Sequence, residues 1–460
     1  MNVLSLSEAQ NLIRARLRSG SRFVSAFLDD TREGRIVRYV LANERHLEPY
    51  AAMLEEPLPT LTDITPAAAW YERELRDIDG ISVCGELDGR SLDPTVSEPV
   101  RRSASSEVST VLYGPVRSGI SESARWLIET AGEDFLGVQA TMFYKRRRIE
   151  ARFIGVALDL APFIAEHVSG ATAASHASAF SRACEVALEI TIPNRARAAR
   201  GVLVEFERIH QHLDVLAKLA DDASLAVGAA QTFALKERVH RFLAAATGNR
   251  FARGCVAIGG VRDDLIPALR REAARSLDDL ERDILAVVAT LFETPSLTDR
   301  LIGTGHLSAE TVVRFGGVGP VARGSGVSCD ARTRDGWLST PLEGDEALER
   351  AGDAFARASV RRREIRRAFR LIRNALDGAS EGPHRVETPL RSGMGYARVE
   401  SPQGELVYFV RIDDGLQRVA IRSATFANWP LFALSLPGNI FTDFSFVEHS
   451  FGAIQAESDR

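Results

Sequence analysis

The residues most able to bind a metal in this sequence are its cysteines, and their spacing argues against such a site. Four cysteines occur, each far from the others: Cys84, Cys184, Cys255 and Cys329. Zinc, iron–sulfur and nickel sites built from cysteine need closely spaced thiolates, and no Cys-x-x-Cys pair is present. Scattered cysteines are typical of a reducing compartment, where they pack as small buried apolar side chains. The sequence therefore predicts no cysteine-built metal site.

Two basic runs could bind a polyanion. The first, Lys145–Arg148, has no interleaved aromatic residues, and the chain carries a net charge of −5. Nucleic-acid-binding surfaces combine clustered cations with a positive domain, so we expect no nucleic-acid partner. The second run, Val360–Arg367, contains Glu364, and we expect it to form a solvated or partner-facing helix side with i,i+4 ion pairs.

Two glycine-rich strings could be mistaken for phosphate-binding loops. Gly303-Thr304-Gly305 and Gly324-Ser325-Gly326 lack the Gly-Lys-Ser/Thr ending of a nucleotide-binding loop and the spacing of a dinucleotide fingerprint. We expect both strings to form tight turns, and we expect no NAD-binding site among this chain's own residues.

Length and composition indicate a folded protein of two or three domains. Hydrophobic residues make up 45% of the 460 residues and charged residues 26%, which is ordinary for globular chains. No apolar run approaches the roughly 20 residues that cross a bilayer, and the best candidate, residues 153–165, contains Asp159. The N-terminus lacks the apolar segment of a signal peptide. Any attachment to a membrane is therefore expected to depend on partner proteins.

Residues 1–93 are predicted to form a small α+β unit. Apolar spacing predicts two helices and two strands, over residues 7–18 and 64–79 and over residues 22–28 and 35–41. The expected turn residues between the strands are Asp29, Asp30 and Gly34. Residues 94–110 are poor in large apolar side chains and rich in Ser, Pro and Glu, which is typical of a linker.

Residues 111–460 are predicted to form a larger α+β domain around a bundle of long helices. Apolar periodicity predicts four helices, over residues 193–216, 224–247, 264–293 and 343–377. Their lengths of about 23 to 35 residues far exceed the average of about 11–12 and favour a bundle. Short peripheral antiparallel strands are expected between residues 112 and 154, at 405–412 and at 418–423.

Several strings occur in the order found in a family of redox subunits. Near the N-terminus, Glu72-Arg73-Glu74, Asp88, Arg90 and Leu92 resemble the signature of the 30-kDa-type subunit of respiratory complex I. Later strings resemble the 49-kDa-type subunit and the large subunits of membrane-bound nickel–iron hydrogenases: Gly114-Pro115, Phe143-Tyr144-Lys145, Thr247-Gly248-Asn249-Arg250 and Gly317–Gly326. Fusion of both parts is similar to formate-hydrogenlyase-type large subunits. The resemblance implies a 30-kDa-type domain, a linker and a hydrogenase-large-subunit-like domain.

The resemblance breaks where hydrogenases hold nickel and iron. In that family two Cys-x-x-Cys motifs provide four thiolates, because soft sulfur ligands suit these metals. In this chain Ser169 and Thr172 stand at the first pair of positions, and Ser450 and Ala453 stand at the second. The resemblance therefore implies a cavity without its metal ligands, and we expect neither nickel nor hydrogen chemistry.

Complex I also lacks these thiolates and reduces a quinone in the same cavity. In that family a histidine after the Gly-Pro loop and a tyrosine near the first lost cysteine hold the quinone head-group. Here Ser121 stands at the histidine position and Gly170 at the tyrosine position. Neither residue can play the family role unaided, so a quinone would need other residues.

Four ionisable residues match family positions near the cavity and are the candidate catalytic residues: Glu150, His176, Asp330 and Arg332. The resemblance implies that Glu150 serves proton movement or binds a hard cation, and that His176 lies beside the cavity. Simpler interpretations are an exposed glutamate after a basic run and a structural histidine on a helix. An idle cavity needs no set of charged side chains, so their presence favours a redox role.

The resemblance implies a peripheral subunit of a membrane-bound energy-converting oxidoreductase. An iron–sulfur small subunit of the complex I 20-kDa type would deliver electrons, and this chain would pass them to a quinone or another acceptor. Ferredoxin-like, antiporter-like and membrane-anchor subunits would complete the complex. The chain itself would bind no cofactor and would lie on the cytoplasmic side of the membrane. The alternative is a non-catalytic structural or coupling subunit of such a complex.

Overall fold

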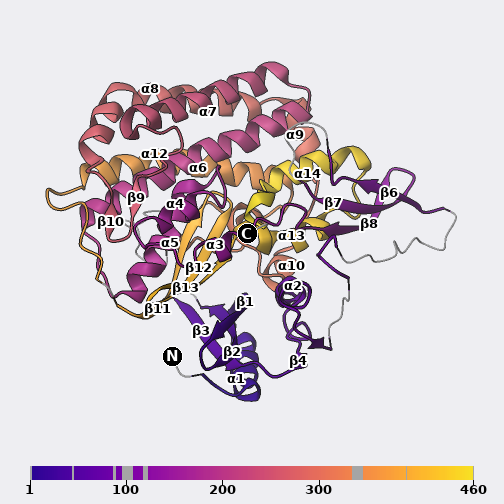
Figure 1. Cartoon of the computed structure of the whole chain (residues 1–460). Coiled ribbons are helices and arrows are strands. Elements are labelled where there is room, and N and C mark those ends of the chain that lie inside the picture. Colours follow the sequence, from indigo (N-terminus) through magenta and orange to yellow (C-terminus); the bar gives the residue numbers. More distant parts are fainter. Residues whose placement is uncertain are drawn as a thin grey trace.

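The computed structural model describes residues 3–43, 46–85, 90–95, 107–117, 123–333, 346–389 and 391–458. The fold is α+β, as the sequence predicted: long helices lie together at one end of the molecule, a three-stranded sheet lies beside them, and the N-terminal elements lie at the opposite end (Figure 1). These N-terminal elements are α1 (Leu6–Arg18), β1 (Arg22–Thr31), β2 (Gly34–Ala42), β3 (Leu47–Met53), β4 (Leu58–Pro59), η1 (Pro66–Ala68), α2 (Ala69–Asp79) and β5 (Val83–Cys84).

The first hairpin differs from the sequence prediction in the position of its turn. β1 extends to Thr31 and pairs with β2, whose first residue, Gly34, has φ of +139°. Asp29 and Asp30 are therefore strand residues, and the prediction that they form the turn is wrong. Asp29 is fully buried, and its carboxylate accepts a hydrogen bond from Arg38 Nε at 2.7 Å. This ion pair offsets the cost of burying a charge inside a strand.

Four long helices form the bundle predicted from apolar periodicity: α6 (Asn194–Asp222), α7 (Ala226–Thr247), α8 (Ile266–Phe292) and α12 (Ala354–Asp377). α6 packs against α7 and α12, and α8 packs against α7 (Figure 1). α12 begins at residue 354, later than the predicted 343, because the Asp353 side chain caps it by accepting the Ala356 N–H at 2.8 Å. None of the described helices combines the length and the apolar character needed to cross a membrane.

The arginine-rich run 360–367 lies within α12, and the prediction of a solvated or partner-facing helix side is wrong for Arg361 and Glu364, whereas Arg363 and Arg366 are exposed. Arg361 and Glu364 are buried, with 1% and 0% of their surface exposed. The Arg361 guanidinium donates to the Phe451 carbonyl at 2.9 Å, and Glu364 pairs with Arg323 of another helix. α12 contacts α6, α11 (Gly319–Gly324) and α14 (Phe444–Phe451), so these charged side chains point into the protein.

The sheet beside the bundle contains one strand that the sequence pattern did not reveal. Its order is β11 (Gly393–Ser401), β12 (Gly404–Asp413) and β13 (Gly415–Arg422), all antiparallel. The β12–β13 hairpin was predicted, whereas β11 was not. α5 (Ala173–Ala187) crosses β11 so closely that a Cβ on Gly395 would collide with the Ala183 carbonyl oxygen. The glycines that weaken the strand signal of β11 are thus explained by this contact.

A second antiparallel sheet projects beside the C-terminal helices (Figure 1). It contains β6 (Ser109–Tyr113), β7 (Arg125–Ala131) and β8 (Asp134–Thr141), as the sequence predicted. Trp126 of β7 contacts Trp429 and Phe432 of α13 (Ala424–Ser435), with ring centroids 5.1 and 4.9 Å apart. Much of the predicted linker lies outside the described residues, and its last two residues, 109 and 110, belong to β6.

The remaining described elements are short and connect the layers. They are α3 (Ile149–Arg152), α4 (Ala161–Glu166), β9 (Val256–Ala257), β10 (Gly260–Val261), α9 (Pro295–Leu301), α10 (Ala309–Arg314), η2 (Ala331–Thr333), η3 (Phe441–Asp443) and η4 (Gln455–Glu457). The two glycine-rich strings lie at turns next to α9 and α11, and Gly303, Gly305 and Gly326 have positive φ, as expected for tight turns.

Ion pairs join the N-terminal elements to the sheet β11–β13. Arg22 of β1 contacts Glu405 of β12 at 2.6 Å, and Arg411 of β12 contacts Asp29 of β1 at 3.0 Å. The Arg418 Nε of β13 donates to the Leu28 carbonyl at 2.9 Å. Burial opposes ionisation of Glu405, but nearby arginines, with Arg22 the strongest, outweigh it and lower its pKa to about 2. Glu405 is therefore held as a carboxylate at this seam.

Candidate functional site

Two segments from different parts of the sequence lie against each other where a cavity was predicted. One is residues 166–176, between α4 and the start of α5, and the other is residues 450–458 at the C-terminus. Arg147 joins them, because its guanidinium donates to the carbonyls of His167 at 2.9 Å and Val168 at 2.6 Å, and also to that of Ala456. One arginine of the basic run 145–148 is thus used inside the protein.

Glu457 also joins the two segments through its side chain. Its Oε1 accepts the Thr172 hydroxyl at 2.6 Å, and its Oε2 accepts the Thr425 hydroxyl at 2.8 Å. The Thr425 oxygen also accepts the backbone N–H of Ile454 at 3.2 Å. Three hydrogen bonds therefore connect Thr172, at the first lost-cysteine pair, with the residue that follows Ala453, at the second pair.

His176 lies on α5 and is fully buried beside this contact. Its Nδ1 is 2.8 Å from the Tyr408 hydroxyl, and its Nε2 is 3.5 Å from Glu457 Oε1. Among the described residues, Nε2 has no hydrogen-bond partner. A histidine between a phenol and a carboxylate can hold a proton and pass it on.

The two serines at lost-cysteine positions have different surroundings. Ser169 is 1% exposed, and its hydroxyl has no hydrogen-bond partner within the described ranges. Ser450 accepts a hydrogen bond from Arg357 Nε at 2.9 Å and donates to the Val447 carbonyl at 2.7 Å. Burial lowers the pKa of the Arg357 guanidinium to about 9, which leaves it charged at neutral pH.

The donor set of these two segments does not fit a nickel–iron centre. Two of its hydroxyls, on Thr172 and Ser450, are hydrogen-bonded to charged groups, Ser169 offers an alcohol and Ala453 a methyl group. Soft divalent and organometallic centres need thiolates, which alcohols do not replace. None of the four cysteines belongs to either segment. Three of them are buried as expected, whereas Cys84 is exposed, contrary to the expectation of burial.

Glu150 lies on α3 and contacts β13. Its Oε2 is 2.7 Å from Arg418 Nη1, and its Oε1 accepts the Ile421 N–H at 2.8 Å. The carboxylate lines a cleft of about 350 Å³ between the N-terminal elements β1 and α2 and the strands β12 and β13. These contacts anchor Glu150 at the seam between the two parts of the chain.

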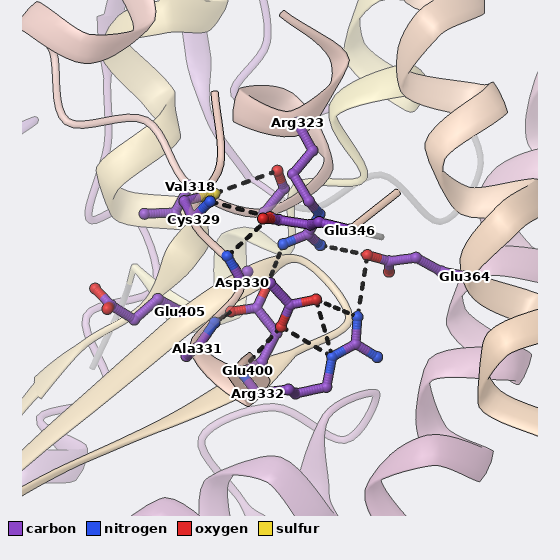
Figure 2. A network of polar contacts seen from close by, with 12 residues as sticks. Val318, Arg323, Cys329, Asp330, Ala331, Arg332, Glu346, Glu364, Glu400 and Glu405 are labelled. Carbon is purple, nitrogen blue, oxygen red and sulfur yellow. Dashed lines mark hydrogen bonds and ion pairs between the residues drawn. The ribbon is translucent and has the colours of Figure 1, made fainter. Parts of the chain in front are cut away.

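Asp330 and Arg332 lie in a buried network of ion pairs (Figure 2). Arg332 contacts both Asp330 oxygens, with Nη2–Oδ2 at 2.6 Å and Nε–Oδ1 at 2.9 Å, and reaches Glu364 at 3.3 Å. Burial disfavours the ionised form of Asp330, but Arg332 and Arg323 outweigh it and hold its pKa below the usual range. Both groups are therefore charged and held by each other.

Arg323 extends this network between helices and sheet (Figure 2). It contacts Glu364 of α12 at 2.5 Å and Glu400 of β11 at 2.7 Å. His212 of α6 lies 2.7 Å from the second Glu364 oxygen. Burial lowers the pKa of His212 to about 3, so the imidazole is neutral and its N–H donates. The network thus fixes α6, α11, η2, α12 and β11 relative to one another.

Of the two expected quinone-contact positions, the structure describes only Gly170. Ser121 lies outside the described residues. Gly170 is exposed, and a Cβ built on it would lie 2.8 Å from Nη2 of Arg253. The guanidinium of Arg253 therefore occupies the space that a side chain at position 170 would fill.

Glu207 is a buried acid that sequence reasoning missed. From α6 it accepts the N–H groups of Ala174 at 2.7 Å and Ser175 at 3.1 Å, in the first turn of α5. Burial raises the pKa of Glu207 to about 8. The carboxyl serves as a helix cap supplied by a neighbouring helix. The sequence signal that could have predicted this buried acid is the position of Glu207 next to Phe206, on the apolar stripe of α6.

Glu457 and Tyr408 were also missed, because their partners are distant in sequence. Glu457 and Thr172 are separated by 285 positions, and His176 and Tyr408 by 232. No local pattern marks such pairs. For Glu457, the only signal in the sequence was its place a few residues after the lost-cysteine positions Ser450 and Ala453.

Comparison with protein families gives two matches along the chain. Residues 19–107 match the family described as the 30 Kd subunit of respiratory-chain NADH dehydrogenase. Residues 224–392 match the family described as the 49 Kd subunit of the same enzyme. The order of the two matches is that expected from the sequence strings.

Curated relatives cover most of the chain. Formate hydrogenlyase subunit 5 of Escherichia coli (strain K12) is 27% identical, with 92% of this chain and 82% of the relative aligned. Carbon monoxide-induced hydrogenase of Rhodospirillum rubrum is 30% identical over 74% of this chain and 96% of the relative. Membrane-bound hydrogenase subunit alpha of Pyrococcus furiosus is 31% identical over 72% of this chain and 82% of the relative.

A solved structure supports the fold. A chain from the membrane-bound sulfane sulfur reductase, an archaeal respiratory membrane complex, aligns with a TM-score of 0.71 at 22% identity. The alignment covers 78% of this chain and 100% of that chain. At this identity the likeness concerns the fold alone.

Proposed function

This chain belongs to the family that joins the 30-kDa- and 49-kDa-type subunits of respiratory complex I to the large subunits of membrane-bound hydrogenases, and we propose that it is a redox subunit of such a complex. It would be a peripheral subunit of a membrane-bound, energy-converting oxidoreductase. It receives electrons from an iron–sulfur cluster of a 20-kDa-type small subunit and delivers them to a quinone or another two-electron acceptor.

The proposed complex supplies what this chain lacks. Ferredoxin-like and small-subunit partners carry the electrons, and antiporter-like and anchor subunits provide the attachment to the membrane. The chain would lie on the cytoplasmic side. This assignment rests on family membership, since the chain's four cysteines provide no thiolate cluster of their own.

The donor set of the two facing segments carries the proposal. Hydrogen chemistry at nickel needs thiolates, and the segments offer Ser169, Thr172, Ser450 and Ala453 instead. Proton-holding groups are nevertheless present, because His176 lies between the Tyr408 hydroxyl and the Glu457 carboxylate. A quinone takes up two electrons and two protons to form a quinol. Buried groups that hold protons beside an acceptor site suit this reaction.

A second candidate function follows from the buried ion-pair network. Asp330 pairs with Arg332, and Arg332 also contacts Glu205 at 3.2 Å and Glu364 at 3.3 Å, so the network holds the helices relative to the sheet. Such a network is what a non-catalytic coupling subunit needs to transmit forces between partners. In that case the chain keeps its interfaces and passes no electrons.

Purification of the native complex through a tag on this chain separates the two functions. The redox function predicts less than about 0.1 nickel atom per chain, an iron–sulfur cluster in a co-purifying small subunit, and quinone reduction by the dithionite-reduced complex. Nickel at one atom per chain with hydrogen evolution would refute it. A complex that has no iron–sulfur small subunit and reduces no acceptor would instead support the coupling function.

A further inference from the structure

A cleft of about 350 Å³ lies at the seam between the N-terminal elements and the rest of the chain. Strand β1 and helix α2 line it from the N-terminal side, whereas α3, the loop before α3, and strands β12 and β13 line it from the other side. β1 and α3 both contact β13 (Figure 1). Ligand pockets have volumes of roughly 300–1,000 Å³, so this cleft suits a molecule at the small end of that range.

Several charged side chains that line the cleft already have partners. Glu150 pairs with Arg418 at 2.7 Å, and the Arg418 Nε also donates to the Leu28 carbonyl at 2.9 Å. Arg422 donates to the Glu405 carbonyl at 2.8 Å. These groups hold the walls of the cleft together and are not available to a ligand.

Three other charged side chains of the cleft have no such partner. Among the described residues, the Asp79 carboxylate and the guanidiniums of Arg146 and Arg148 form no hydrogen bond and no ion pair. Asp79 is half-buried, whereas Arg146 and Arg148 are exposed. The unpaired charges therefore comprise an acid inside the cleft and two cations nearer the solvent.

The position of Asp79 favours a cation beside it. Asp79 is the last residue of α2, where the partial negative charge of the helix C-terminus disfavours a carboxylate. Burial is the largest cause that raises the pKa of Asp79, to about 6; Arg418 and Arg146 lower it, and Glu150 and Asp30 raise it. At neutral pH the group is thus mostly a carboxylate whose charge is not compensated. An ammonium group bound next to it would offset this cost.

The two unpaired arginines favour an anionic group at the exposed side of the cleft. Guanidiniums bind carboxylates and phosphates through paired, charge-assisted hydrogen bonds. Arg148 has φ of +53°, a conformation that few residues with a side chain adopt. Much of the remaining lining is apolar and includes Leu75, Ile78 and Ile154. The cleft therefore presents one acid, two cations and apolar walls to a ligand.

We propose that this cleft binds a small molecule in which an apolar chain joins an ammonium group, held by Asp79, to a carboxylate or phosphate, held by Arg146 and Arg148. Such a ligand contacts both parts of the chain, because Asp79 belongs to α2 and the arginines belong to the loop before α3. Its binding adds to the contacts that join the N-terminal elements to the sheet β11–β13. The ligand takes no part in electron transfer, so the site goes beyond the proposed redox function.

The test is calorimetric titration of the full-length chain at low ionic strength, where screening is weakest. The probes are 4-aminobutyrate, 6-aminohexanoate and the corresponding aminoalkyl phosphates, each compared with the analogue that lacks the ammonium group. We expect at least one probe to bind roughly 10- to 100-fold more tightly than its analogue, as for a hydrogen bond between charged groups. Tighter binding of the carboxylates or of the phosphates identifies the anionic group.

Substitutions assign the two halves of the site. Asp79→Asn keeps the shape of the side chain and should remove the advantage that the ammonium group confers. Replacement of both arginines, Arg146→Gln with Arg148→Gln, should weaken the binding of each probe and of its analogue. Asp414→Asn is the matched control, because Asp414 is exposed in the β12–β13 turn and does not line this cleft.

Circular dichroism establishes that each variant folds. The proposal is wrong if no probe binds more tightly than its analogue, or if a folded Asp79→Asn chain keeps the full advantage. Should Asp79→Asn fail to fold, unchanged binding by the double arginine variant would overturn the proposal instead. None of these results bears on the redox function, which is tested by the metal content and acceptor reduction of the native complex.

Discussion

Replacement of Glu364 by glutamine tests the buried ion-pair network. The Glu364 carboxylate contacts Arg323 at 2.5 Å, His212 at 2.7 Å, Arg332 at 3.3 Å and Arg208 at 3.5 Å. All five side chains are at most 1% exposed. Glutamine has nearly the same shape, so Glu364→Gln removes the charge and leaves the packing almost unchanged.

The expected loss of stability is about 3–5 kcal/mol, the cost of leaving buried charges without their partner. That is a large part of the roughly 5–15 kcal/mol that separates folded from unfolded domains. Glu349→Gln is the control, since Glu349 pairs with Arg363 at 3.5 Å and the two side chains are 32% and 57% exposed. An exposed pair of this kind contributes about 0–1 kcal/mol.

Urea unfolding of the full chain, followed by circular dichroism, measures both variants. Burial opposes ionisation of Glu364, but Arg323 and Arg332 outweigh it and hold its pKa well below the usual range. Its contribution is therefore complete above the unfolded pKa of about 4.3 and is lost as the pH falls below that value. Glu364→Gln should lack this acid dependence. A stability change below about 1 kcal/mol would show that the network stabilises the fold no more than surface pairs do.

Three further changes probe separate features. Glu207 has a folded pKa of about 8, so its contribution to stability is complete below about pH 4.3 and is lost as the pH rises towards 8. Over this pH range the urea midpoint of Glu207→Gln should therefore fall less steeply than that of the unmodified chain. Gly319→Ala, whose Cβ would collide with a carbonyl of the β11–β12 turn, should lower the free energy of unfolding by more than 3 kcal/mol, whereas Gly303→Ala meets no atom within 4 Å and should cost about 1 kcal/mol. Ser450→Ala leaves Arg357 Nε without its acceptor and should cost about 1–3 kcal/mol, measured by the same unfolding curves.

The long helices were the most predictable part of the fold. Their apolar stripes repeat over many turns, so α7 and α8 were located within two residues of both ends and α6 within one residue of its start, although α6 continues to Asp222, beyond the predicted residue 216. β11 was missed because Gly393 and Gly395 interrupt its pattern, and these glycines are needed for the close passage of α5. The start of α12 was misplaced because its cap, Asp353, is a single polar residue within a polar stretch.

The site was less predictable, because the sequence pattern alone does not show whether a charged residue is exposed or buried. From sequence alone, the arginine run of α12 predicts an exposed helix face. Arg361 and Glu364 are nevertheless buried, because α12 lies between other helices. Sequence strings located the segments around Ser169 and Ala453, but they could not reveal that Glu457 connects them. That contact depends on a tertiary approach between distant parts of the chain.

The ion pairs between the N-terminal elements and the sheet β11–β13 bear on how this chain would enter the proposed complex. Were the two parts separate polypeptides, each would have to find the other at cellular concentration before Asp29 and Glu405 met their arginines. A covalent connection replaces that encounter with an intramolecular one, at an effective concentration on the order of millimolar. Both parts then reach the assembly in fixed one-to-one proportion, and the carboxylates of this seam are paired as soon as the chain has folded.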